Sequence, residues 1–283
     1  TFTNNGILTL DRVGFAMTAP SGWTATAVPT VIPSQVRSGE VIKASWHVAV
    51  PPGAHLGQAP ITMQAVYTAG DQRGVTYGSV SVLGAYATLA DAFNNAGISA
   101  DADVTAADFD GTGTSYSEQA LTSVGFGPGA VITHGGLTFT WPDVPASQPD
   151  NVVATGQTIL LSGSGTTLGF LGAAGSDGQR GSGTVYYTDG STSTFQLTLA
   201  SYLGPPNPGS DSVAVLPYVN GGPAGQSEQA AYVFYAAVPV TSAKTVQAVT
   251  LPGHGSGRPS GMHIFAAGIG PLQLPGTPSG ASD

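Results

Sequence analysis

The chain contains no cysteine, and only 8% of its 283 residues are charged. The absence of cysteine excludes a disulfide framework and a metal site built from thiolates. Lysine occurs only at Lys43 and Lys244, and the formal net charge is −9. Proteins that bind nucleic acid need a basic patch, so this composition argues against a nucleic-acid partner. No apolar run reaches the roughly 18 residues of a spanning helix, which argues against membrane insertion.

The residues that are abundant favour strands joined by short turns. The chain has 41 glycines and 21 prolines, and Val, Thr and Tyr are frequent. Hydrophobic residues make up 41% of the chain, which argues against disorder. The low charge with abundant Gly, Thr and Ser is typical of bacterial extracellular proteins. The sequence therefore predicts an all-β protein, and its length fits two domains.

Residues 1–83 predict a small immunoglobulin-like β-sandwich. Alternating segments follow one another at intervals of roughly ten residues, separated by turn signals. In "EVIKASWHVAV" the even positions 42–48 are apolar, which predicts a strand with one buried face. We expect Trp23 and Trp46 to fill the core of this sandwich, with an exposed sugar-binding platform as the alternative. The opening "TFTNNGILTL" already reads as the inside of a strand and suggests a piece cut from a longer protein.

Residues 92–271 predict a larger jelly-roll β-sandwich after a linker at 84–91, and the polar tail 272–283 is expected to be flexible. Strands are expected at 137–141, 158–163, 167–174, 183–188, 194–200, 213–218, 231–240, 245–252 and 262–270. Asp189-Gly190 lies between two alternating runs and predicts a hairpin with a type I′ turn. A short helix is expected after Ser117 as N-cap, ending at Gly125.

Catalytic motifs are scarce. The chain has three glutamates, and no Gly-x-Ser-x-Gly elbow, P-loop or Gly-x-Gly-x-x-Gly motif occurs. The five histidines lack the spacing of a zinc site. Asp108 and Asp110 in "ADFDGTG" suit either a turn in which Asp caps its own backbone or a structural calcium ion. No cofactor is required by this pattern, and that calcium ion is the open alternative.

Sugar binding needs an aromatic face for the apolar side of a pyranose and polar groups for its hydroxyls. Trp141 ends its strand at Pro142, so its ring fits either the core, which is favoured, or a binding rim. The weaker candidates lie near strand ends or in loops, and they are Tyr116, Tyr202, Tyr218, Asp150 and Asn151.

Two parts of the sequence resemble known domain families. The stretch "TAPSGWTATAV" and the later "VRSGEVIKASWHVAVPPGAHLGQAPITMQAVY" resemble the NPCBM-associated NEW domain over most of residues 8–83. The matching positions are Pro20, Gly22-Trp23, Ser38-Gly39, Val48 to Pro51, Ala54, Gly57 and Tyr67. The second region is similar to the galactose-binding-like jelly-roll module at the C-terminus of actinobacterial glycoside hydrolases. The stretches that carry it include "AFNNAGISAD", "FDGTGTSYSEQAL", "GLTFTWPDV", "PDNVVATGQTI" and "HIFAAGIG".

These resemblances imply a non-catalytic accessory region of a secreted or cell-surface bacterial glycoside hydrolase. Its expected partners are a carbohydrate and the catalytic domain upstream in the same chain, which it would brace. Two alternatives stay open: a structural spacer or adhesion module that binds no sugar, and, least favoured because convergent acids are scarce, an unrecognised hydrolase.

Overall fold

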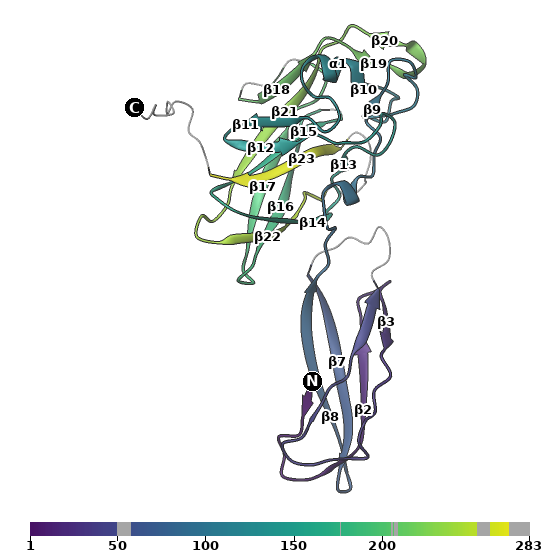
Figure 1. Ribbon diagram of the computed structural model, residues 1–283, viewed down its shortest axis with the longest axis vertical. Coiled ribbons are helices and arrows are strands. Elements are labelled where there is room, and N and C mark those ends of the chain that lie inside the picture. The colour runs from purple at the N-terminus through teal and green to yellow at the C-terminus, as the bar shows by residue number, and fades with distance from the viewer. Residues whose placement is uncertain (50–57, 176, 205, 207–208, 254–260, 272–283) are drawn as a thin grey trace. The chain divides into compact units, whose positions relative to one another are not determined.

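The computed structural model describes residues 1–49, 58–175, 177–204, 206, 209–253 and 261–271 (Figure 1). The chain divides into two compact units, Thr1–Gly84 and Ala85–Asp283. Strands dominate both units, so the all-β prediction is confirmed. No helix among the described residues is long and apolar enough to cross a membrane. The predicted tail, His55 and residues 254–260 of the run "GHGSGRPSG" lie outside the described residues.

Unit 1 contains one large antiparallel sheet and two small ones. The large sheet has the strand order β4-β2-β7-β8, and its strands are β2 (Leu10–Thr18), β4 (Gln35–Val36), β7 (Gln58–Ala69) and β8 (Gln72–Leu83). The small sheets pair β1 (Phe2–Thr3) with β5 (Val41–Ile42), and β3 (Thr24–Ala27) with β6 (Trp46–Ala49). The strands β7 and β8 form a long hairpin, which is visible in Figure 1.

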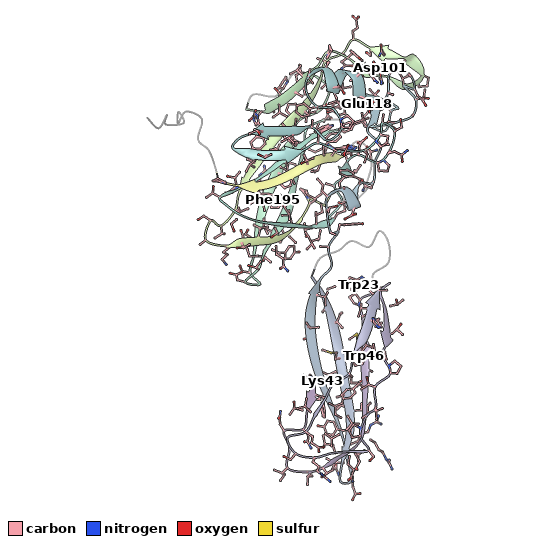
Figure 2. The ribbon with its side chains drawn as sticks, viewed as in Figure 1. Trp23, Lys43, Trp46, Asp101, Glu118 and Phe195 are labelled. Atoms are coloured by element: carbon pink, nitrogen blue, oxygen red, sulfur yellow. The ribbon has the colours of Figure 1, made fainter. Side chains whose placement is uncertain are left out.

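The buried core of unit 1 is small. It consists of Leu10, Val13, Val36 and Ile42, against which partly buried Phe2, Phe15, Ile32, Tyr67 and Ala69 pack. The predicted alternation is confirmed, because the odd positions 41–47 are exposed while the even positions 42–48 are buried or half-buried. The expected core position of the tryptophans is wrong. Trp23 and Trp46 are both half-buried and lie outside this cluster (Figure 2).

Unit 2 is built from two main sheets with smaller ones beside them. The first has the order β13-β23-β15-β21-β18 and the second β14-β22-β16-β17. Their strands are β13 (Val152–Val153), β14 (Thr158–Ser164), β15 (Thr167–Ala174), β16 (Gln179–Tyr187), β17 (Thr192–Leu199), β18 (Asp211–Leu216), β21 (Ala231–Pro239), β22 (Thr245–Thr250) and β23 (Met262–Gly270). All nine strands expected from the sequence are present, with small differences at their ends.

Shorter elements complete unit 2. A four-stranded sheet of order β20-β19-β10-β9 and the hairpin β11-β12 flank the main sheets. These strands are β9 (Ile98–Ser99), β10 (Ser115–Ser117), β11 (Val131–His134), β12 (Leu137–Thr140), β19 (Val219–Asn220) and β20 (Gln226–Ser227). The helical elements are α1 (Glu118–Ser123) and the 3-10 turns η1 (Ala90–Ala92) and η2 (Gly222–Ala224). Tyr86 pairs with Ile159, so residues of the expected linker pack on unit 2.

Strand β15 lies at the centre of the core, and every one of its residues is buried. Its two faces meet different layers, because successive side chains point in opposite directions. Phe170 stacks with Phe195 of β17, with ring centroids 5.8 Å apart. On the opposite face Gly169 lies so close to Leu137 of β12 that an added Cβ would come within 2.4 Å of its side chain. A continuous apolar run such as "TLGFLGAA" is what burial on both faces requires.

The predicted helix cap and the predicted hairpin are both present, but the predicted type of the hairpin turn is wrong. Ser117 caps α1 as predicted, since its Oγ accepts a hydrogen bond of 3.0 Å from the Ala120 amide. The hairpin at Asp189-Gly190 is also present, between β16 and β17. Its turn is not type I′, because only Gly190, at φ 83°, takes a positive φ. Asp189 instead keeps an ordinary φ, and its side chain accepts a hydrogen bond from the Ser191 amide at 2.9 Å.

Candidate functional site

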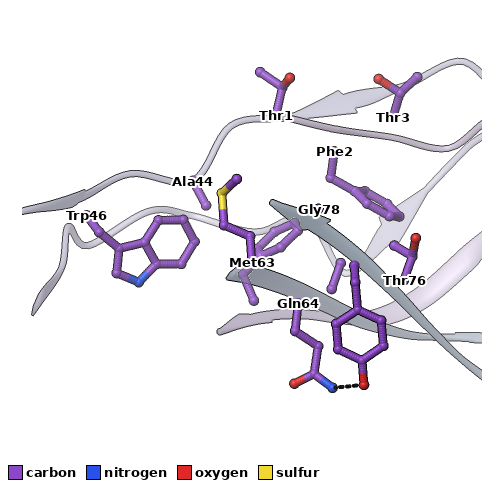
Figure 3. Close-up of a pocket in the computed structure, with 12 residues that line it drawn as sticks. Thr1, Phe2, Thr3, Ala44, Trp46, Met63, Gln64, Thr76 and Gly78 are labelled. Carbon is purple, nitrogen blue, oxygen red and sulfur yellow. Dashed lines mark hydrogen bonds between the residues drawn. The ribbon is translucent and has the colours of Figure 1, made fainter. Parts of the chain in front are cut away.

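Unit 1 contains an open groove of about 260 Å³ between its large sheet and the strands that face it. Figure 3 shows Phe2, Ala44, Trp46 and Met63 gathered on one side of the β7–β8 hairpin. Phe2 contacts Phe15 with ring centroids 5.8 Å apart, which fixes one end of the groove. Trp46 is only half-buried, so part of its indole is available to a ligand.

The strand register explains which residues line this groove. Residues that lie opposite one another in an antiparallel pair share a face. Met63 is opposite Gly78 and Ala65 is opposite Thr76, so these four residues form the floor on β7 and β8. An added Cβ at Gly78 would meet no atom within 4 Å, which shows that the floor is unfilled there. The groove therefore exists because β8 places glycine where a sandwich strand ordinarily places a core side chain.

The side chains that line the groove are uncharged. Its lining contains no Asp, Glu, Lys, Arg or His, but it includes threonine hydroxyls next to the aromatic and aliphatic groups. Gln64 and Tyr77 contribute from the outer face of the sheet, where the Gln64 amide donates a hydrogen bond of 3.2 Å to the Tyr77 hydroxyl. An apolar ring edged by neutral polar groups suits an uncharged ligand with one apolar face.

The structure does not bring the six predicted sugar-binding residues into one open site. Trp141, Tyr116, Tyr202, Asp150 and Asn151 are each at most 2% exposed. Trp141 takes the core position that was favoured for it, stacked on Phe265 at 4.5 Å and edge-on to Phe126 at 5.0 Å. A ring enclosed in this way offers no face to a sugar, so Trp141 has no exposed surface that could form a binding rim.

Tyr218 is the predicted residue that keeps an accessible surface. Its hydroxyl donates a hydrogen bond of 2.8 Å to the Asp101 carboxylate, which also accepts one from Ser117 at 2.5 Å. Partial burial would raise the pKa of Asp101, but these hydrogen bonds outweigh it and hold that pKa below its ordinary value. Asp101 lies near α1 together with Glu118 (Figure 2). This corner is polar and charged, in contrast to the groove of unit 1.

Asp150 and Asn151 belong to a buried polar network. Asp150 accepts hydrogen bonds from the Gly97 and Ile98 amides at 3.0–3.2 Å and from the Asn151 side chain at 2.6 Å. Asn151 Oδ1 lies 2.7 Å from His263 Nδ1. Burial raises the pKa of Asp150 to about 7, although its three donors act in the opposite direction. The network ties the loop before β9 to β13 and β23.

Two carboxylates, Asp150 and Glu118, border the same small cavity beside Trp141. Its volume is about 10 Å³, which is room for no more than one water molecule. Hydrolysis of a glycoside needs space for a sugar and a water between two carboxyl groups. This pair therefore cannot act as the acid and base of a hydrolase in the structure described here.

Asp108 and Asp110 form a hydrogen-bonded turn. Asp108 Oδ1 accepts from the Gly111 and Gly113 amides at 2.7 and 3.1 Å. Asp110 accepts from the Thr112 amide at 2.8 Å, and its second oxygen accepts from the Tyr202 hydroxyl at 2.7 Å. These bonds are those of the predicted capping turn. No group of three or more His, Cys, Asp or Glu side chains suited to a metal ion occurs among the described residues, and the calcium ion stays a prediction.

Two known domain families match parts of the chain. Residues 85–269 match the AziU2-like beta-sandwich domain, which is more than half of the chain. The chain belongs to the AziU2-like β-sandwich domain family. Residues 1–68 match the NPCBM-associated, NEW3 domain of alpha-galactosidase, which confirms the resemblance seen in that part of the sequence. The family that matches the second region is therefore not the galactose-binding-like module that its sequence resembles. The relation of this region to that module stays a prediction.

Other comparisons add little to the AziU2-like assignment. No curated protein matches the chain. Among solved structures, the secreted serine protease VesC from Vibrio cholerae overlaps 93% of this chain and 44% of its own, at 10% identity and a TM-score of 0.40. The chain thus spans less than half of the VesC chain, and so loose an overlap says nothing about function.

Sequence reasoning missed the groove and placed Trp46 in the core. The signal that identifies it lies in "RGVTYGS", where Gly74 and Gly78 occupy the same face of β8. Tyr67 covers Gly74, since an added Cβ there would come within 2.3 Å of its ring, but nothing covers Gly78. Which glycine is left open depends on the register between β7 and β8, and the sequence does not state that register.

Proposed function

We propose that this chain is a non-catalytic accessory region of a secreted bacterial glycoside hydrolase and that it binds a neutral carbohydrate. The observation that carries the proposal is the half-buried Trp46 indole at the edge of a groove in unit 1 that is lined by uncharged side chains. Aromatic rings bind the C–H face of a pyranose, and neutral hydroxyl and amide groups suit its hydroxyls. The match of residues 1–68 to a domain described from alpha-galactosidase supports the same class of parent enzyme.

We infer that the catalytic residues of the parent enzyme lie outside this region. Four acidic residues of unit 2, Asp101, Asp108, Asp110 and Asp150, accept hydrogen bonds from neighbouring donors. We infer that the partner of this region is a catalytic domain of the same polypeptide, which the accessory region holds near its substrate. Trp46 and the groove, rather than the buried Trp141, would make the contact with the glycan.

The test is glycan binding by the intact chain and two matched tryptophan variants. Wild-type protein is applied to a glycan array and to insoluble polysaccharides. We expect retention that is lost in Trp46→Ala and kept in Trp23→Ala, because Trp23 is half-buried in the same unit but does not line the groove. Wild-type protein that is retained by no glycan would instead favour a structural spacer or adhesion module. Turnover of chromogenic glycosides by the purified chain would revive the hydrolase alternative.

A further inference from the structure

The dipeptide Asn-Gly occurs at two places in the chain, Asn5-Gly6 and Asn220-Gly221. In this dipeptide the backbone nitrogen of the glycine can attack the side-chain carbonyl carbon of the asparagine. Glycine favours the attack because it has no Cβ to block the approach and lets the backbone rotate. The reaction also needs an asparagine side chain that is free to turn towards that nitrogen, so the folded structure determines which dipeptide reacts.

Asn5 has this freedom. It is exposed in the irregular segment that joins β1 to β2, and Ile7, two residues later, is 94% exposed. The Asn5 side chain makes no hydrogen bond to the described residues. The other asparagines in the described part of the chain hold their side-chain amides in hydrogen bonds, and they are Asn4, Asn94, Asn95, Asn151 and Asn220.

Asn220 provides a comparison within the same chain. It is 0% exposed and lies in β19, between β10 and β20. Its Nδ2 donates hydrogen bonds to the Ser99 carbonyl at 3.2 Å and to the Ser99 hydroxyl at 2.9 Å. The Gly221 amide donates to the Gly225 carbonyl at 2.6 Å. Both reacting groups are therefore held, and Asn220 can react only when this part of the sheet opens.

One contact slows the reaction at Asn5. The Gly6 amide, whose nitrogen would attack, donates a hydrogen bond of 3.0 Å to Asn4 Oδ1. Asn4 is itself fixed, because its Nδ2 donates to the Leu8 carbonyl at 2.8 Å and to the Val36 carbonyl at 3.0 Å. A hydrogen bond of ordinary net strength that must break before the attack slows it by about two- to tenfold. Asn5 should therefore react more slowly in the folded chain than in the unfolded chain, but it should still react.

We propose that Asn5-Gly6 is a site of spontaneous covalent modification, at which Asn5 is converted to aspartate and isoaspartate in the folded protein. The Gly6 nitrogen gives up its proton to solvent and forms a bond to Asn5 Cγ. The bond from Cγ to the side-chain nitrogen breaks, and that nitrogen leaves as ammonia, which closes a five-membered succinimide ring. Water then opens the ring at either carbonyl. The sum of the steps is amide plus water giving carboxylate and ammonium, with no oxidant or reductant.

The isoaspartate product changes the backbone at a fixed point of unit 1. It routes the chain through the former side chain and so adds a carbon atom between Asn4 and Gly6. The Asn4 carbonyl accepts from the Gly39 amide at 2.8 Å, so the added atom displaces Gly6 rather than Asn4. We expect the hydrogen bond from Gly6 to Asn4 to be lost and the Tm of the modified chain to fall. This inference does not depend on glycan binding.

The experiment follows both dipeptides in the intact chain. The protein is incubated in a mildly alkaline buffer, folded in one sample and unfolded in urea in the other, and peptide mass spectrometry detects the gain of about one dalton at each asparagine. In the folded sample we expect Asn5 to convert at least about tenfold faster than Asn220. In urea the two should convert at similar rates, and Asn5 about two- to tenfold faster than in the folded sample.

A variant checks the route of the reaction. Gly6→Ala keeps Asn5 but hinders the attacking nitrogen, and the added Cβ comes no closer than 3.3 Å to its nearest neighbour, Asn4 Oδ1. We expect conversion of Asn5 to slow at least about tenfold in this variant, in the folded chain and in urea alike. An Asn5 that stays intact in the folded chain for as long as it takes to convert fully in urea would overturn the proposal. So would equal rates at Asn5 and Asn220 in the folded chain, or an undiminished rate in Gly6→Ala.

Discussion

Asn151 donates a hydrogen bond of 2.6 Å to the Asp150 carboxylate, although both side chains are shielded from solvent. The other end of the same amide meets His263 at 2.7 Å. The carboxylate also receives the Gly97 and Ile98 amides, so its oxygens are well supplied with donors. Burial nevertheless dominates, and the pKa of Asp150 is raised to about 7. The protein holds this acid close to the point where it changes charge at neutral pH.

The first prediction concerns the pH dependence of stability. A raised folded-state pKa means that the folded protein binds the proton more tightly than the unfolded chain, whose Asp titrates near 3.8. Asp150 therefore contributes most stability below about pH 4, and this contribution falls as the pH rises to about 7, by at most about 4 kcal/mol. Chemical denaturation between pH 4 and 8 measures the slope. We expect Asp150→Asn to flatten it.

The control for this titration is Asp143→Asn, because Asp143 is exposed on the same segment. Glu118, which borders the cavity beside Asp150, and His263, which contacts Asn151, are the neighbouring titratable groups. Glu118→Gln separates the contribution of that acid. A wild-type slope that survives in Asp150→Asn would show that Asp150 is not the group responsible.

A second prediction distinguishes a capping turn from a calcium site at Asp108. Because Asp108 Oδ1 accepts two backbone amides, Asp108→Ala should cost about 1–3 kcal/mol, while Asp108→Asn keeps an acceptor oxygen and should cost less. The hydrogen bonds favour the turn, so we expect EDTA to leave the Tm unchanged. Thermal denaturation of wild type and both variants with EDTA or added calcium makes the measurement. A Tm that drops in EDTA and returns with calcium would establish the metal site.

A third prediction concerns Ser117, which joins a helix cap to a carboxylate. Its Oγ accepts from the Ala120 amide and donates to Asp101. We expect Ser117→Ala to destabilise the fold by about 1 kcal/mol and to raise the pKa of Asp101 towards its ordinary value, because one donor is lost. Denaturant unfolding and a carboxyl-carbon NMR titration of Asp101 test the two effects. Ser123→Ala removes a hydroxyl that donates at the end of the same helix, and it should leave the Asp101 titration unchanged.

The long strands of unit 2 were predictable because period and turn chemistry agree there. Strands β15 and β23 match their expected ranges at both ends, since Gly175 ends the first apolar run and Gly261 and Pro271 bound the second. The strands of two or three residues, such as β9 and β10, carry no periodic signal and depend on tertiary pairing. The turn type at Asp189-Gly190 was wrong because Asp189 hydrogen-bonds forward to Ser191 and needs no positive φ.

The candidate site was less predictable than the fold. Aromatic residues near strand ends predict binding surfaces only when no other layer covers them. Trp141 is covered by Phe265 and Phe126, which are distant in sequence. Trp46 sits on a correctly predicted inward-facing position, but the layer opposite it is incomplete at Gly78. The alternation of apolar and polar residues in the sequence shows which face of a strand a side chain lies on. Whether other side chains cover that face depends on the register of the partner strands.

The last prediction separates filling the groove from damaging the sheet. Gly74 and Gly78 lie on the same face of β8, but an added Cβ meets the Tyr67 ring at Gly74 and open space at Gly78. Gly78→Val should raise stability by up to about 1 kcal/mol, because a β-branched residue replaces glycine in a strand, while its side chain occupies the groove beside Met63. Gly74→Val should lower stability, since Tyr67 must move away from its contact with Phe2.

Thermal unfolding and glycan retention are measured on both variants. If Trp46 binds sugar from this groove, Gly78→Val loses retention while becoming more stable, a combination that unfolding cannot produce; undiminished retention would place the sugar elsewhere.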